Sequence, residues 1–193
     1  MSHGDDLNEF SDRELEIWKK VIDVQMHFND LELRVRNYAI LSLGAIITVS
    51  GYTLKDGNHV PISGFNVPFA SITLFCGAII WLCFWFMDRH WYHRLLLGSV
   101  QHGIKIEKKY KECAPSICLS ETIKEESPND FLGLVWRSQH RLNLFYWTIA
   151  VCLLFFSFSL VNWMFAIVLL IFAITMTIII LISTLEFATP PSP

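Results

Sequence analysis

Charge is missing where the sequence is most apolar. The four longest apolar runs contain no Asp, Glu, Lys, Arg or His: residues 38–54, 67–87, 142–160 and 164–185. Coupled transporters and proton pumps usually carry such groups near the middle of the membrane. Inverted-repeat transporters also have two equivalent helices broken by Pro or Gly, and these runs show no such pair. The sequence therefore argues against a secondary transporter.

Motifs of known enzymes are missing as well. The chain has no Gly-x-Gly-x-x-Gly fingerprint, no P-loop and no Gly-x-Ser-x-Gly elbow. Arg89 and His93 stand closer together than the Arg and His of HEPN-type ribonucleases. A net charge of −3 gives no basic surplus for nucleic acid, and residues 1–37 hold no apolar segment of a signal peptide. We therefore expect no enzyme, no cofactor and no direct nucleic-acid binding.

Apolar residues are in surplus, and they are arranged in blocks. Of the 193 residues 53% are hydrophobic, and the mean hydropathy is +0.41, values that few soluble domains reach. The block from Leu142 to Leu185 would be roughly 66 Å long as one helix, whereas a bilayer core is about 30 Å thick. It must therefore fold back, and residues 161–163 (Val-Asn-Trp) are the best turn because Asn tolerates turn geometry and Trp prefers the membrane interface.

Five cysteines form no disulfide framework in this pattern. Cys76, Cys83 and Cys152 lie inside apolar runs, where Cys behaves as a small hydrophobe.

Lysine and arginine set the orientation. Of the 15 Lys and Arg residues, only Lys55 lies outside the segments before residue 38 and between residues 88 and 141. The positive-inside rule places those segments, and therefore both termini, in the cytoplasm. We predict an all-α, polytopic protein of the bacterial inner (cytoplasmic) membrane with four transmembrane helices, several of which continue into a cytoplasmic helical stalk.

The predicted order along the chain follows from these runs. It comprises a cytoplasmic N-terminal helix (1–37), the first span (38–54), an external loop (55–66), the second span (67–87), a cytoplasmic helical region (88–141), the third span (142–160), an external turn (161–163), the fourth span (164–185) and a cytoplasmic tail (186–193).

Three of the four spans are expected to continue as helices into the cytoplasm. Ser11 and Glu14 fit a capping box, and no Pro or Gly follows before Gly44, which predicts one helix over 12–54. A second helical pattern runs from 69 to 112. Beyond it we expect a loop, and a new helix that starts at residues 127–130 and leads into the third span.

The first helix carries a heptad pattern of apolar residues: Ile17, Val21, Val24, Phe28, Leu31, Val35 and Tyr38. This face can pack on the protein's own helices, on neighbouring subunits, or on the lipid surface. Gly44, Thr48 and Gly51 share a face within the first span, where small residues allow close helix approach. Together the two features favour a homo-oligomer.

Residues 88–103 gather three histidines beside two arginines and an aspartate. Interface anchoring and helix–helix hydrogen bonding explain most of this stretch, because aromatic and basic residues mark the edges of spans. A weaker alternative is a metal site built from His90 and His93 with Cys113 and Cys118. The cations expected to contact lipid headgroups or a cytoplasmic protein partner are Arg89, Arg94, Lys105, Lys108, Lys109, Lys111, Arg137 and Arg141.

The segments HFNDLELRVRNYAI (27–40) and DRHWYHRLLLGSVQHG (88–103) flank a hairpin of two spans. This arrangement resembles small bacterial inner-membrane proteins found beside phage-defence genes: SLATT-type effectors, RipA-type octameric membrane proteins, and the Kiwa-type membrane subunit, whose four-span count is the most similar. The resemblance covers roughly residues 12–110. It implies a homo-oligomer that acts with a soluble effector encoded nearby, either by sensing an event at the membrane or by permeabilising it. From the long polar segments we expect a membrane sensor or scaffold that recruits a cytoplasmic partner through residues 88–141.

A pore is the alternative function. Ser, Thr and small residues in the spans could line a neutral path that gates by dewetting. The simpler interpretation is that the Ser and Thr hydroxyls bond the backbone of their own helices.

Overall fold

A computed structural model of the chain describes residues 12–62, 64–112, 117–126, 129–131, 134–136 and 138–186. The chain divides into two compact units. The first, here the polar unit, comprises Met1–Ile40 and Cys83–Phe145, and the second, the apolar unit, comprises Leu41–Leu82 and Tyr146–Pro193.

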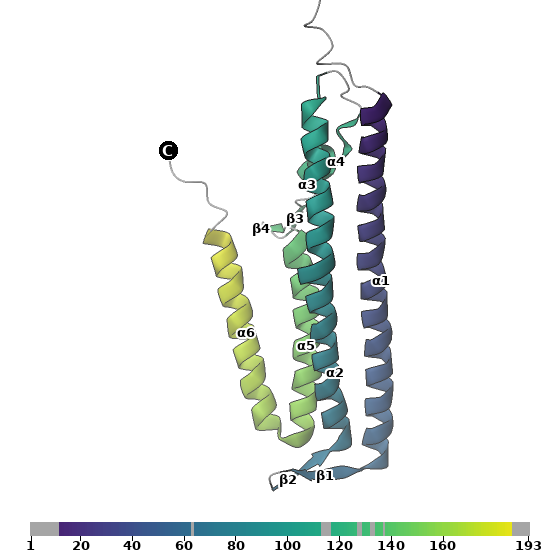
Figure 1. Cartoon of the computed structure of the whole chain (residues 1–193). Helices are drawn as coiled ribbons and strands as arrows, with labels where there is room; N and C mark the ends of the chain where they lie inside the picture. The colour runs from purple at the N-terminus through teal and green to yellow at the C-terminus, as the bar shows by residue number, and fades with distance from the viewer. Residues whose placement is uncertain are drawn as a thin grey trace, which may run out of the picture. The chain divides into compact units, whose positions relative to one another are not determined.

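Helix α1 (Asp12–Asp56) is a single helix of 45 residues, as its sequence predicts (Figure 1). Its first turn carries Asp12 and Glu14, where carboxylates favour the positive end of the helix dipole. It ends at Asp56, and the next residue, Gly57, has a φ of 64° in the left-handed region that favours glycine.

The second long helix is also continuous, over Phe69–Lys109. It consists of α2 (Phe69–Phe86), a π-helical segment η1 (Met87–Tyr92) and α3 (His93–Lys109). The sequence predicts the continuity, but not the π-helical turn at the point where the apolar run gives way to polar residues. The N–H of His93 donates to the carbonyl oxygen of Asp88, five residues back, as a π-turn requires.

Two small hairpins interrupt the otherwise helical chain, and the sequence does not predict them. Strands β1 (His59–Ile62) and β2 (Phe65–Pro68) pair antiparallel, with Val60 opposite Val67. Gly64, with φ of 86°, supplies the turn conformation between them. The predicted external loop is therefore mostly a hairpin, and α2 starts two residues later than the predicted second span.

The region before the third span differs more from its prediction. The expected loop contains α4 (Leu119–Glu126), and the expected helix start at 127–130 is wrong, because β3 (Asn129–Phe131) and β4 (Leu134–Trp136) form a hairpin there. Helix α5 (Ser138–Val161) begins only after it.

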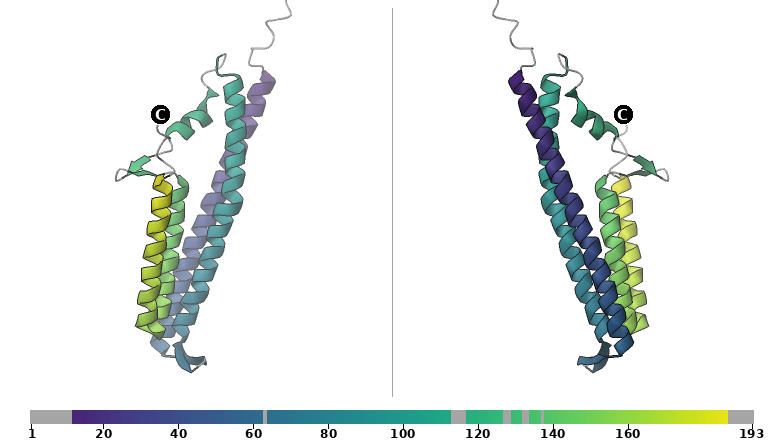
Figure 2. Two further views of the ribbon diagram at one scale, coloured as in Figure 1. Left: turned by 90° about the vertical axis from the view of Figure 1, so that its left-hand side faces the viewer. Right: turned by 90° about the vertical axis from the view of Figure 1, so that its right-hand side faces the viewer.

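Helices α5 and α6 (Trp163–Glu186) form an antiparallel hairpin around Asn162 (Figure 2). The Asn162 side-chain oxygen accepts the N–H of Met164 at 2.9 Å and caps α6. This confirms the predicted turn at 161–163.

Three described helices are long and apolar enough to cross a membrane: α1, the α2–α3 helix and Arg141–Val161. The fourth predicted span lies in α6, where Trp163–Thr175 forms a shorter apolar helix. The chain is therefore helical and compatible with a membrane, while the fourth span and the orientation stay predictions.

Reciprocal polar contacts hold α2 to α5 in the apolar unit. Ser71 donates to the carbonyl oxygen of Ser157 and Ser157 donates to that of Ser71, each at 2.8 Å. The indole N–H of Trp81 donates to the carbonyl oxygen of Tyr146 at 2.9 Å, and both side chains are 1% exposed. Such bonds join membrane helices because lipid offers polar groups no other partner.

Gly77 lets α2 approach α1 closely. A Cβ placed there would lie 2.5 Å from the Cγ2 of Ile46, whereas one at Gly44 would meet nothing within 4 Å. We expect Gly77→Ala to destabilise the fold by about 1–3 kcal/mol because the branched Ile46 must move. Gly44→Ala is the matched control and should be neutral or slightly stabilising. Thermal unfolding in detergent measures both, and equal melting temperatures would contradict the close contact.

Candidate functional site

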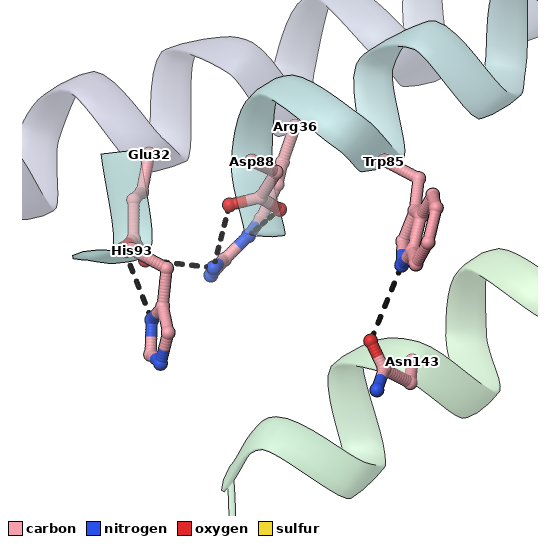
Figure 3. Close-up of polar contacts among 6 residues, drawn as sticks. All are labelled: Glu32, Arg36, Trp85, Asp88, His93 and Asn143. Carbon is pink, nitrogen blue, oxygen red and sulfur yellow. Dashed lines mark hydrogen bonds and ion pairs between the residues drawn. The ribbon is translucent and has the colours of Figure 1, made fainter. Parts of the chain in front are cut away.

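A cluster of four ionisable side chains lies inside the polar unit (Figure 3). Glu32 and Arg36 come from α1, Asp88 from η1, and His93 from the first position of α3. The Arg36 guanidinium donates from Nε to Asp88 Oδ2 at 2.8 Å and from Nη2 to Asp88 Oδ1 at 3.2 Å. The same Nη2 donates to Glu32 Oε2 at 2.8 Å. His93 Nδ1 lies 3.2 Å from Glu32 Oε1.

Burial makes this cluster energetically important. Asp88 is 0% exposed and Glu32 is 3% exposed, so both carboxylates have left water, and Arg36 is a cation that donates to both of them. The fork of an arginine can satisfy two oxygens of one carboxylate, which a lysine cannot do. The Nε2 of His93 is buried with no hydrogen-bond partner among the described residues.

The π-helical turn explains how one helix supplies two members. Asp88 and His93 are five residues apart, a spacing that places side chains on different faces of an α-helix. A π-turn winds more residues into each turn than an α-helix does, so residues five apart lie closer to a common face. Both side chains therefore reach α1, Asp88 at Arg36 and His93 at Glu32.

His90 has different neighbours from His93. Its ring stacks on Phe86 with centroids 5.3 Å apart and meets Trp85 edge-on at the same distance. The Trp85 indole donates to the side-chain oxygen of Asn143 at 3.2 Å (Figure 3).

The metal alternative finds no support in the part of the chain that is described. No group of three His, Cys, Asp or Glu side chains there could hold an ion. Cys118 is a half-buried free thiol, while Cys113 lies outside the described residues.

A third buried carboxylate, Glu107, joins three elements of the polar unit. It accepts the indole N–H of Trp18 at 3.3 Å and the backbone N–H groups of Ser120 and Glu121 at 3.0 and 2.9 Å. It is 0% exposed and caps the first turn of α4 from α3. This contact is the physical reason for α4, which the sequence does not signal locally.

The packed face of α1 differs from the predicted heptad. Val21, Phe28 and Val35 are covered as expected, but Ile17 and Val24 stay 45% and 44% exposed. The polar unit instead covers the adjacent positions Trp18, Gln25, Glu32 and Ala39. Gln25 donates to the carbonyl oxygen of Ser99 at 3.3 Å and to the Ser120 hydroxyl at 3.4 Å. The buried seam is thus partly polar, and Leu31 is half-buried while Tyr38 is 60% exposed.

The small residues of the first span have no close neighbours from other described elements of the apolar unit. A Cβ at Gly44 or Gly51 would meet nothing within 4 Å, and Thr48 donates to the carbonyl oxygen of Gly44 at 2.8 Å. The hydroxyls of Thr73, Thr175 and Thr177 bond their own helices in the same way. A role of this face in an oligomer stays a prediction.

The predicted contact cations fall into distinct settings. Lys109 pairs with Glu14 at 3.3 Å and Lys111 with Glu121 at 3.1 Å, both inside the polar unit. Arg89 is half-buried, while Arg94, Lys105, Lys108 and Arg141 are exposed, as are the paired Lys109 and Lys111. Arg137 lies outside the described residues. Lys105 and Lys108 form no ion pair with any described residue and are available to a partner.

No family model, no curated protein sequence and no solved structure matches this chain. Function must therefore be argued from the two units and their contacts.

Proposed function

We propose that the protein is a homo-oligomeric component of the bacterial inner membrane that presents its polar unit to a cytoplasmic effector, as a sensor or scaffold in anti-phage defence. The observation that carries this proposal is the continuity of two helices. Helix α1 and the helix Phe69–Lys109 each contain an apolar stretch long enough to cross a bilayer and a polar stretch beyond it. At 1.5 Å per residue each exceeds about 60 Å, twice a bilayer core.

The ion cluster supports coupling between these two helices. It joins α1 to η1 and α3 at the end of the apolar run of α2, where a movement of the membrane segment would first reach the polar unit. A buried network has few alternative arrangements, because any unpaired carboxylate is costly. Displacement of one helix therefore moves the other as well.

The positive-inside rule directs the polar unit to the cytoplasm, and its exposed cations suit an acidic partner surface. The defence setting rests on the resemblance of residues 27–40 and 88–103 to membrane proteins of phage-defence loci.

Plating efficiency of phages tests the proposal. The strain carries the native locus, with the gene deleted or replaced by the variant Lys105→Glu/Lys108→Glu. We expect both changes to abolish protection, and the variant to assemble normally in the membrane. A charge reversal at exposed Lys55, on the other side of the predicted first span, is the control and should protect fully. If the deletion leaves plating unchanged for a broad phage panel, the defence role is wrong.

A pore is a second candidate, favoured by the open face of Gly44 and Gly51. If several copies bring this face to a common axis, purified protein in liposomes should release a trapped ion on activation. Leucine at both glycines would then block the release.

A further inference from the structure

The outer surface of α1 repeats every seven residues in four adjacent columns. An apolar column holds Ile17, Val24, Leu31 and Tyr38. A basic column holds Arg13, Lys20, His27 and Arg34. An acidic or amide column holds Glu16, Asp23, Asp30 and Asn37. The fourth column begins with Lys19 and is apolar from Met26 on, with Leu33 and Ile40. We call these four columns the outer face of α1.

The outer face is uncovered in the polar unit, except at Leu31, which is half-buried. All members of the basic and acidic columns are exposed. The apolar columns are unusually open for a water-facing helix, with Val24 44%, Met26 58% and Leu33 48% exposed. A groove of about 990 Å³ follows the first of them, between Ile17, Lys20 and Val24 of α1 and Ser99 and His102 of α3.

The seven-residue period indicates which kind of partner binds the outer face of α1. Apolar residues that return every seven positions stay on one line only for a partner helix that runs along α1. A lipid surface would not require this period, and the acidic column would be repelled by anionic lipid.

The order of the columns indicates that the partner is the same helix. Around α1 the order is apolar, basic, acidic, apolar. When two such helices lie parallel, the first apolar column of one can face the second apolar column of the other. In that arrangement the basic column of the first helix faces the acidic column of the second. Copies inserted in one membrane share orientation and depth, so equivalent residues lie at equal height.

We propose that the outer face of α1 binds the outer face of α1 in a second copy of this chain, with Lys20 of one copy opposite Asp23 of the next. The contact joins two different sides of the helix and is therefore heterologous, so it extends from copy to copy. It forms a closed ring when the rotation between neighbouring copies divides a full turn. This inference rests on the homo-oligomer of the proposed function and assigns its contact surface.

A charge swap tests the pairing. Lys20→Glu and Asp23→Lys each place like charges across every contact, and neither residue has an ion pair with a described residue of its own chain. We expect either single variant to raise the protein concentration at half-dissociation by about tenfold or more. The double variant Lys20→Glu/Asp23→Lys should restore assembly, because every contact regains one acid and one base. Mass measurement of the full chain in mild detergent over a dilution series gives the result.

Two further variants keep the test decisive. Val24→Asp should leave only single chains, since it buries a charge in the apolar column, while Lys105→Glu on α3 should assemble as the wild type does. Circular dichroism checks that every variant retains its helices. A wild-type protein that is a single chain at all concentrations overturns the homo-oligomer itself. If the Val24→Asp variant assembles as the wild type does, the outer face of α1 is not the contact surface, while the homo-oligomer itself still stands. If the double variant does not regain wild-type assembly, Lys20 of one copy does not pair with Asp23 of the next, and the proposed contact is wrong.

Discussion

Replacing Arg36 with methionine is expected to destabilise the protein by about 3–5 kcal/mol, the cost of removing one partner from a buried ion pair. Asp88 is 0% exposed and Glu32 is 3% exposed, and both accept hydrogen bonds from the Arg36 guanidinium. Methionine fills similar space but leaves both carboxylates without their cation. For a chain of this length, the melting temperature should fall by roughly 10 °C. Thermal unfolding in detergent, followed by circular dichroism, measures the change.

Arg34 provides a matched control two residues away on α1. It also pairs with an acid four residues before it, Asp30 at 2.7 Å, but the two side chains are 64% and 53% exposed. Exposed pairs of this kind contribute about 0.3–0.5 kcal/mol, so at a dilution where the chains are separate Arg34→Met should change the melting temperature by no more than about 2 °C. Equal effects of the two substitutions would contradict the special role of the buried cluster. Adding Asp88→Asn to Arg36→Met should recover part of the loss, because the amide carries no charge.

Glu107→Ala is expected to release α4 from α3. The substitution removes the acceptor of the Ser120 and Glu121 backbone N–H groups and of the Trp18 indole. Hydrogen bonds to charged groups are worth about 1.5–3 kcal/mol each, and α4 is only 8 residues long, too short to persist alone. Hydrogen exchange at 119–126 should therefore rise to the rate of an unprotected peptide, with the exchange of α2 and α5 unchanged.

Glu112→Ala removes an exposed carboxylate near the same end of α3 and serves as the control, with no expected change in exchange. Glu107→Gln keeps one acceptor oxygen and should give an intermediate result. Continued protection of α4 in Glu107→Ala would show that its other contacts suffice.

The sequence predicts those features that depend on local properties. The long helices follow from the absence of Pro over residues 12–56 and 69–109, and the 161–163 turn follows from the mismatch between the length of the apolar block and a bilayer. These features require no knowledge of which segments are neighbours.

The partners of α1 could not be predicted in this way. Two seams with the same alternating spacing of three and four residues lie next to each other on α1. One runs through Val24 and the other through Gln25. The seam through Val24 is the more apolar, so the sequence predicts that this one is buried. The structure covers the second, because α3 and α4 supply a carbonyl and a hydroxyl to Gln25. The same applies to Glu32, which is buried only because Arg36 and His93 meet it. A polar residue in a seam is a core residue when its partners are present.

The π-helical turn and the Glu107 cap also depend on contacts between residues that are far apart in the sequence. Asp88 and Glu107 look like ordinary helix residues in the sequence, and neither has a local motif. The one available signal was an acidic residue immediately after an apolar run, at Asp88, since a carboxylate at a membrane edge needs a partner. The uncovered apolar columns of α1, in contrast, follow from the predicted heptad pattern once the intramolecular seam is known.

Electron microscopy of the full-length protein in lipid nanodiscs tests the central claim most directly. A membrane scaffold predicts several copies with their polar units gathered on one face of the bilayer, the α1 helices parallel and in contact, and no aqueous channel along the axis. A single copy, or polar units that do not meet, would contradict the scaffold. A ring of copies around an open aqueous channel would contradict the scaffold and favour the pore as the function of the protein.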